Sequence, residues 1–143
     1  MEKEGETVSN FTPEEIAYLQ SQRLGRLATV GQDGQPHVVP VGFRYNAELD
    51  TIDIGGHDFA KRKKYRDVQR NPRVAFVVDD LASVSPWRPR MIEIRGTAEV
   101  LGSGGEQVIP RFDTEMFRIR PRRIVSIGIE DGENIGWNAR SVS

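Results

Sequence analysis

The segment KRKKYRDVQRNPR, which runs from Lys61 to Arg73, decides how the rest of this chain is interpreted. It holds seven Lys or Arg residues and one Asp, a net charge of +6, and lies between two apolar, strand-like runs. The whole chain carries a net charge of −1, so the residues outside the segment sum to −7. The positive charge is therefore local, and we expect an anion-binding site here. The alternative interpretation is a solvated helix face, which is the common fate of a run of charges.

The absence of Gly and Pro predicts one short helix over Ala60 to Gln69, ended by Asn71-Pro72 because a residue before proline is pushed out of the helical region. Its first turn would place Lys61 and Lys64 on one face, beside unpaired N–H groups and the positive end of the helix dipole. Arg62 adds a planar guanidinium that suits two phosphate oxygens, and Lys64 a compact charge. These residues therefore predict a phosphate site.

Composition indicates a single soluble domain, with Met1 to Asn10 as a disordered or frayed tail and residues 11–143 forming the domain. No run approaches the ~18 apolar residues of a membrane span, and the acidic, polar start is unlike a signal peptide, so we expect a cytoplasmic protein. The chain has no Cys and two His, which excludes disulfides and thiol nucleophiles and makes a metal site unexpected. We expect neither a nucleic acid nor a membrane as partner.

The remaining pattern predicts short strands joined by tight turns. A helix is expected from Thr12-Pro13-Glu14-Glu15, which is typical of a capping box, to near Gln22. Gly31-Gln32-Asp33-Gly34 would be the turn of the first hairpin. The expected strands are Leu24–Val30, Pro36–Tyr45, Thr51–Ile54, Val74–Val78, Met91–Leu101 and Phe117–Glu130, the last broken by Pro121. Because the order lacks a βαβ rhythm, the fold class is predicted as mostly β, an antiparallel barrel.

The connections between these strands carry further expectations. Asp79-Asp80 would cap the end of a strand and not form a metal or acid pair, because adjacent strand residues point to opposite faces. Ser83 to Arg90 would be a polar loop that carries Trp87 between two prolines, and Gly102 to Gly105 a flexible connection. Trp137 to Arg140 would dock the C-terminal tail.

The order of these motifs resembles the flavin split-barrel proteins, which share the pyridoxamine 5′-phosphate oxidase-like fold. The small actinobacterial branch that uses the deazaflavin coenzyme F420 is the closer likeness. The motifs are Leu27-Ala28-Thr29-Val30, Asp33-Gly34-Gln35-Pro36-His37-Val38-Val39-Pro40-Val41, Asn71-Pro72-Arg73-Val74 after the basic helix, and Glu93-Ile94-Arg95-Gly96-Thr97-Ala98. The resemblance spans most of Phe11 to Glu130. It implies a six-stranded antiparallel split β-barrel that forms a homodimer, with the cofactor ring in the cleft between the subunits.

The resemblance also implies where the cofactor binds. In that family an Arg-x-Lys at the start of the helix holds the cofactor phosphate, and Arg62-Lys63-Lys64 falls at this place. The strand from His37 to Val41 would lie along the ring, and Gly55-Gly56-His57 along the ribityl chain. Trp87 would reach the ring from the partner chain, and Arg88 the acidic tail of the coenzyme. The expected cofactor-binding residues are His37, Val39, Pro40, Val41, Gly56, His57, Lys61, Arg62, Lys64, Trp87 and Arg88.

The implied activity is that of an F420-dependent oxidoreductase, which passes a hydride to an electron-poor double bond in a small organic substrate. No residue is assigned as catalytic. The alternative is an FMN-binding flavin reductase or oxidase. Val39 stands where pyridoxamine phosphate oxidases carry an arginine, Arg44 is a candidate replacement, and the motif for the pyridoxal substrate is not visible. Three other interpretations stay open: a nucleic-acid-binding surface on residues 61–73, a non-catalytic cofactor carrier, and purely structural roles for His37 and Trp87.

Overall fold

The computed structural model of this protein describes residues 8–129 and 137–143. Its helices are α1 (Pro13–Ser21), α2 (Lys63–Arg70) and α3 (Gly105–Val108), with a 3-10 turn, η1, at Phe59–Lys61. None of the described helices is long and apolar enough to cross a membrane. The strands are β1 (Leu24–Val30), β2 (Pro36–Asn46), β3 (Thr51–Gly55), β4 (Arg73–Ser83), β5 (Arg88–Leu101), β6 (Met116–Ile127) and β7 (Trp137–Ser141).

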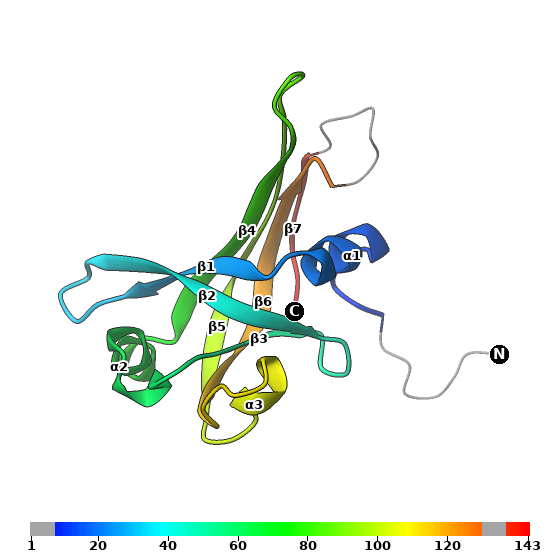
Figure 1. The fold of residues 1–143 in the computed structure, drawn as a ribbon. Coiled ribbons are helices and arrows are strands. Elements are labelled where there is room, and N and C mark those ends of the chain that lie inside the picture. The colour runs from blue at the N-terminus through cyan, green and yellow to red at the C-terminus, as the bar shows by residue number, and fades with distance from the viewer. Residues whose placement is uncertain (1–7, 130–136) are drawn as a thin grey trace.

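Six strands close into an antiparallel barrel (Figure 1). Their order is β3-β2-β1-β4-β5-β6, and β3 pairs back with β6, where Ile54 lies opposite Phe117. The expected six-stranded antiparallel barrel is therefore confirmed. Large apolar side chains such as Leu27, Phe76 and Phe117 are fully buried in its core, and each contributes roughly 1.5–3 kcal/mol through burial.

Helix α1 is anchored to the seventh strand, which the sequence patterns did not indicate. The predicted capping box is present: Glu15 N–H donates to Thr12 Oγ1, and Thr12 N–H donates to Glu15 Oε1. The same Glu15 carboxylate is buried and accepts bonds from Arg140 of β7 (Nη2 to Oε1, 2.5 Å) and from Ser126 of β6 (2.7 Å). Arg140 thus docks the end of the chain as expected. Trp137 does not, because it is 70% exposed.

Strand β4 runs further than expected, and Asp79-Asp80 lies inside it. Each Asp is paired with an arginine, Asp79 with Arg26 (2.9 Å) and Asp80 with Arg90 through two bonds (2.9 and 2.5 Å). Asp80 and Arg90 are also cross-strand partners in the β4–β5 register. The expectation of a strand end at residue 78 was wrong, because this pairing lets charged residues continue the ladder. The expected loop from Ser83 to Arg90 shrinks to a turn at residues 84–87.

The bend expected at Gly96 is present as a break in the β5–β6 register between Arg95 and Gly96. A side chain at Gly96 would not fit, since an added Cβ would lie 2.1 Å from Arg120 O. Pro121 lies opposite Gly96, and β6 continues through it. The expectation that Pro121 breaks the strand was wrong, because the bulge accommodates a residue without an N–H.

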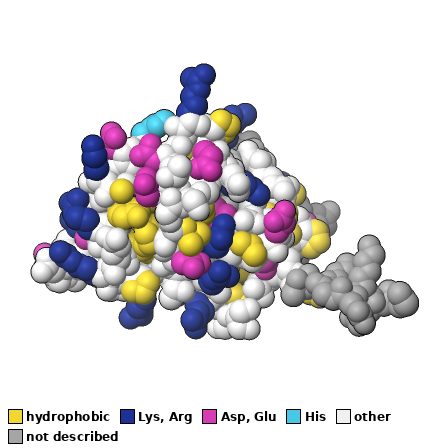
Figure 2. Space-filling view, turned by 90° about the horizontal axis from the view of Figure 1, so that it is seen from below, with side chains coloured by type: hydrophobic (Ala, Val, Ile, Leu, Met, Phe, Trp, Pro, Cys, Tyr) yellow, Lys and Arg dark blue, Asp and Glu magenta, His cyan; other side chains and the backbone are white. Residues whose placement is uncertain are grey.

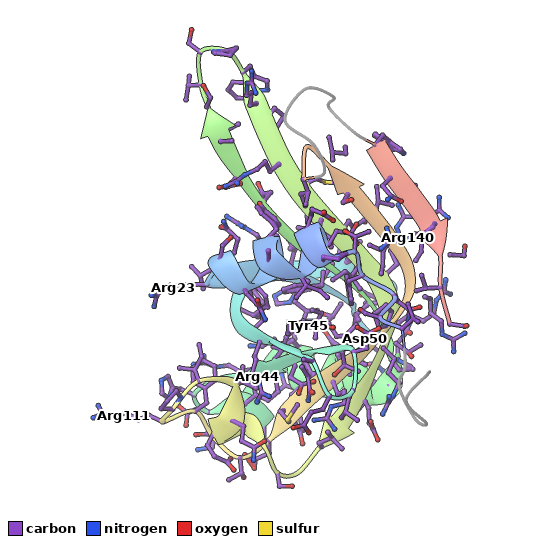
Figure 3. The ribbon with its side chains drawn as sticks, turned by 90° about the vertical axis from the view of Figure 1, so that its right-hand side faces the viewer. Arg23, Arg44, Tyr45, Asp50, Arg111 and Arg140 are labelled. Atoms are coloured by element: carbon purple, nitrogen blue, oxygen red, sulfur yellow. The ribbon has the colours of Figure 1, made fainter. Side chains whose placement is uncertain are left out.

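Two segments that were expected to be frayed or flexible make specific hydrogen bonds. Ser9 and Asn10 both bond the Asp50 carboxylate (2.5 and 2.8 Å), which also accepts a bond from Tyr45 OH (2.7 Å; Figure 3). Ser9 and Asn10 therefore do not belong to a frayed tail, and residues 1–7 of the expected tail lie outside the described ones. Gly105, the last residue of the expected flexible connection, starts α3, and its N–H donates to Thr114 O (2.8 Å).

Candidate functional site

A cleft of about 500 Å³ lies where β2, the end of β3 and the start of α2 meet. Eight of the eleven predicted cofactor-binding residues are in its lining: His37, Val39, Pro40, Val41, Gly56, His57, Arg62 and Lys64. The other lining residues are Gly42, Gly55, Lys63 and Phe112. The fold therefore brings together the strand from His37 to Val41, the turn at Gly55-Gly56-His57 and the cations Arg62 to Lys64. In the sequence, only the family resemblance connected these three segments.

The basic segment is not one helix. Turn η1 ends at Lys61, Arg62 is extended (φ −78°, ψ 151°), and α2 begins at Lys63. Phe59 explains the break, because its buried ring packs edge to face on Phe117 at 4.6 Å between centroids, and the chain must turn after it. Lys61 therefore does not share a helix face with Lys64, and it is absent from the cleft lining. The expectation that Lys61 and Lys64 share a helix face was therefore wrong.

The start of α2 offers two cations to a ligand. Lys63 is already paired with Asp67 (2.6 Å). Arg62 donates from Nε to His57 O (3.3 Å), and Lys64 Nζ lies 5.2 Å from the centroid of the Phe59 ring. Within the described residues, no carboxylate forms an ion pair with Arg62 or Lys64. Burial and the neighbouring Arg62 charge lower the pKa of Lys64, so an anion placed between the two would relieve their repulsion.

The strand side of the cleft has an open edge at His37 to Val41, because the pairing of β2 with β3 begins only at Gly42. Gly42 and Gly55 face each other across β2 and β3, and side chains cover their backbone: a Cβ added to Gly42 would lie 2.8 Å from Ile109 Cδ1 and 3.0 Å from Phe112 Cζ. His37 Nδ1 is buried and has no hydrogen-bond partner among the described residues. A narrow backbone edge, an unsatisfied ring nitrogen and two cations fit a flat ligand with a phosphate.

Figure 2 views the molecule from below Figure 1 and shows Lys and Arg side chains spread over this face, interspersed with Asp and Glu side chains and with patches of hydrophobic side chains. Within the described residues, no group of three or more His, Asp or Glu side chains is placed to hold a metal ion.

Known proteins resemble this chain in sequence and in fold. The sequence model for pyridoxamine 5′-phosphate oxidase matches residues 11–134. The chain belongs to the pyridoxamine 5′-phosphate oxidase family. A reductase of Streptomyces rimosus, described as acting on 5a,11a-dehydrotetracycline and 5a,11a-dehydrooxytetracycline, is 48% identical over 133 residues, which are 93% of this chain and 94% of that protein. Together the two matches make the protein an oxidoreductase.

Two solved structures share the fold at low sequence identity. A protein of Mycobacterium tuberculosis superimposes with a TM-score of 0.64 at 23% identity, covering 95% of this chain and 98% of that one. An FMN-binding, pyridoxamine 5′-phosphate oxidase-related protein of Nostoc punctiforme gives a TM-score of 0.61 at 11% identity, covering 94% and 98%. These likenesses confirm the split-barrel fold.

Trp87 and Arg88 lie outside the cleft of their own chain in this family member. They stand at the tip of the β4–β5 hairpin, which projects beyond the barrel and away from α2 (Figure 1). Trp87 is 64% exposed. Arg44 is also outside the lining, and its Nη1 donates to Gln107 O (3.2 Å). A contribution of Trp87 or Arg88 to the site requires a second subunit.

Sequence reasoning missed Phe112 and Gly42 as lining residues. Phe112 follows α3 in a segment to which no motif was assigned. Its one signal is a large apolar residue among the otherwise polar residues 111–115. That pattern indicates an anchored aromatic ring but does not say what the ring faces.

Proposed function

We propose that this protein is an F420-dependent reductase that acts on an electron-poor carbon–carbon double bond of a small organic substrate. The observation that carries the proposal is the cleft itself. It joins Arg62 and Lys64, which form no ion pair with a described carboxylate, to the open edge of β2 at His37 to Val41. The 48% identical relative is named for reducing dehydrotetracyclines. A conjugated, polycyclic compound is therefore the proposed class of substrate.

The residues of the cleft divide into two roles in this proposal. Arg62 and Lys64 hold the cofactor phosphate, each through charge-assisted bonds of about 1.5–3 kcal/mol. The strand from His37 to Val41 presents its backbone to the polar edge of the ring, and the turn at Gly55-Gly56-His57 accommodates the carbon chain. When bound in its reduced form, the deazaflavin supplies a hydride from carbon, and the protein supplies binding and orientation.

A homodimer completes the proposed site. The projecting end of the β4–β5 hairpin, here called the hairpin arm, carries Trp87 and Arg88 away from the cleft of its own chain. We propose that it reaches the cleft of a partner subunit. Large apolar side chains on the outer strands support such an interface, because each is at least 42% exposed. These side chains are Leu24, Val38, Leu81 and Trp137.

FMN is the second candidate cofactor. It carries a planar ring, a ribityl chain and a single phosphate, and the structurally similar Nostoc punctiforme protein is described as FMN-binding. The cleft residues would take the same roles with either cofactor. Side-by-side titration of the purified protein with F420 and with FMN separates the two candidates.

The double variant Arg62→Ala, Lys64→Ala tests the phosphate site. We expect its affinity for the preferred cofactor to fall by more than about tenfold, since two charge-assisted bonds are lost. The double variant Lys61→Ala, Arg66→Ala is the matched control, because it removes the same charge from the same segment outside the cleft lining. Its affinity should stay within about threefold of the original protein, as expected for screened surface charges.

Isothermal titration measures the affinities of both variants, and thermal unfolding of the cofactor-free proteins checks that they fold alike. Equal affinities for the two double variants would remove the phosphate role from Arg62 and Lys64. Cofactor binding without turnover of any dehydrotetracycline-like compound would favour a non-catalytic cofactor carrier. Binding of nucleic acid with a steep salt dependence would favour a nucleic-acid-binding surface on residues 61–73.

A further inference from the structure

Phe112 is the one side chain in the cleft lining, besides the bare backbone of Gly42, that neither the sequence motifs nor the family resemblance assigned. We propose that its ring covers the carbon chain between the phosphate and the planar ring of the bound cofactor. This inference rests on the proposed function and adds a binding residue to it. The argument depends on where the ring lies, what holds it there and what it faces.

The Phe112 ring lies directly on the backbone of β2 and β3. A Cβ added to Gly42 would be 3.0 Å from Phe112 Cζ, and one added to Gly55 would be 3.0 Å from Phe112 Cδ2. Gly42 and Gly55 are cross-strand partners, so they form one flat platform without side chains. The ring therefore occupies the space that the side chains of two ordinary residues would fill.

The chain on both sides of Phe112 holds the ring in this place. Asp113 N–H donates to Gly56 O (3.0 Å), and Asp113 Oδ2 accepts from Phe59 N–H (3.2 Å). Arg111 has a left-handed backbone (φ 75°), and its side chain points away from the molecule (Figure 3). A left-handed conformation costs a residue with a side chain about 1 kcal/mol or more, and surrounding contacts must sustain it. Here those contacts orient Phe112.

The ring faces the part of the cleft that suits an apolar chain. Phe112 packs edge to face on His57 at 5.3 Å between centroids, and both rings line the cleft together with Gly55 and Gly56. The cations Arg62 and Lys64 line the same cleft, so a phosphate held there leaves its attached carbons beside the aromatic pair. An apolar cover there would remove C–H surface from water and limit the access of water to the phosphate.

Riboflavin, FMN and F420 test this assignment because they separate the chain from the phosphate. Riboflavin carries the ring and the chain but no phosphate. We expect Phe112→Ala to lower the affinity for all the ligands that the protein binds by about tenfold, equivalent to ~1.4 kcal/mol of lost apolar cover. In contrast, Arg62→Ala with Lys64→Ala should weaken only the phosphate-bearing ligands.

Two further variants complete the experiment. Phe112→Tyr keeps the ring and should restore the affinity to within about twofold. Ile109→Ala is the matched control, because Ile109 also packs over Gly42 but does not line the cleft. Should Phe112→Ala not fold, Phe112→Leu provides the same comparison with a smaller expected loss, about threefold, since part of the apolar cover is kept.

The possible outcomes separate the inference from the proposed function. Loss of affinity in Phe112→Ala or Phe112→Leu, with recovery in Phe112→Tyr and no change in Ile109→Ala, supports the inference. Unchanged affinity in Phe112→Ala, or an equal loss in Ile109→Ala, overturns the inference alone. If the original protein binds none of the three ligands, the proposed function and the inference fall together.

Discussion

Lys64 sits in a setting that ties its charge to ligand binding. Burial and the adjacent Arg62 lower the pKa of its ammonium group from the ordinary value of 10.5, and the side chain lies over the Phe59 ring. A half-buried lysine that forms no ion pair with a described carboxylate is costly to keep charged. An anion bound between Lys64 and Arg62 would offset this cost.

This setting predicts a pH dependence of cofactor binding. Because the pKa of Lys64 is lowered, Lys64 loses its proton as the pH rises toward 10.5, and the attraction for phosphate falls with it. We expect the affinity for the phosphate-bearing cofactor to decline as the pH rises through the lowered pKa of Lys64. Lys64→Arg should move the decline to higher pH, since a guanidinium stays protonated.

Titrations of the original protein and of Lys64→Arg with one phosphate-bearing ligand, from pH 7 to pH 10.5, measure the difference. Ionisation of the ligand itself is common to both proteins and cancels in their ratio. A ratio that stays constant over this range would show that Lys64 does not hold the phosphate.

The residues of the candidate site that could be predicted are those whose charge or backbone restriction is visible in the sequence. Arg62 and Lys64 stand out by charge, and Gly56 and Pro40 by backbone restrictions, so all four were placed in the cleft before the fold was known. Phe112 was not, because an aromatic side chain looks the same in a sequence whether it fills a core or covers a ligand. Its role follows only from the two glycines beneath it.

At the scale of elements, the predictions failed where contacts distant in the sequence override local preference. Residues 60–69 have no helix breaker, yet packing of Phe59 on Phe117 splits them into η1 and α2. Strand β4 has an acidic pair at positions typical of a strand end, yet Arg26 and Arg90 keep it extended. Neither partner can be identified from local sequence, because each lies on another strand.

The connection of α1 with β7 gives a test at this scale. Burial alone would raise the pKa of Glu15, but bonds from Arg140 and Ser126 outweigh it and hold that pKa below 4.5. Removing Arg140 leaves the buried Glu15 carboxylate without its counter-charge, held only by Ser126 and the Thr12 N–H, so Arg140→Ala should cost about 3–5 kcal/mol of unfolding free energy. Arg123→Ala, which removes an exposed contact between β6 and β7 (Nη1 to Ser141 Oγ, 3.4 Å), should cost less than about 1 kcal/mol.

Urea unfolding at pH 7 and at pH 4 measures these differences. A carboxylate with a depressed pKa contributes stability above its unfolded pKa, and that stability is lost as the pH falls through the folded value. The original protein should therefore lose stability below about pH 4.5, and Glu15→Gln should lose less over the same range. Equal costs for Arg140→Ala and Arg123→Ala would contradict the anchoring role.

At the scale of the whole molecule, the hairpin arm and the exposed apolar side chains predict an assembly of two subunits. Sedimentation equilibrium should give twice the chain mass of 16.1 kDa. Val38→Glu places a charge on a 64% exposed valine of the outer sheet face and should shift the mass toward one chain.

Trp87→Ala should leave the mass unchanged but weaken cofactor binding by about tenfold, as expected for the loss of an aromatic contact. A single-chain mass for the original protein would refute this arrangement.

Strand β6 pairs with β5 along its length, with β3 near its start and with β7 near its end. The barrel is therefore sealed by a strand that leaves the ribosome after every other member of the closed ring. Until Met116 to Ile127 has been synthesised, the nascent chain holds β3 and β5 with one free edge each, and such edges recruit foreign strands. The last strand of the ring to be made is thus the one that covers both of these edges.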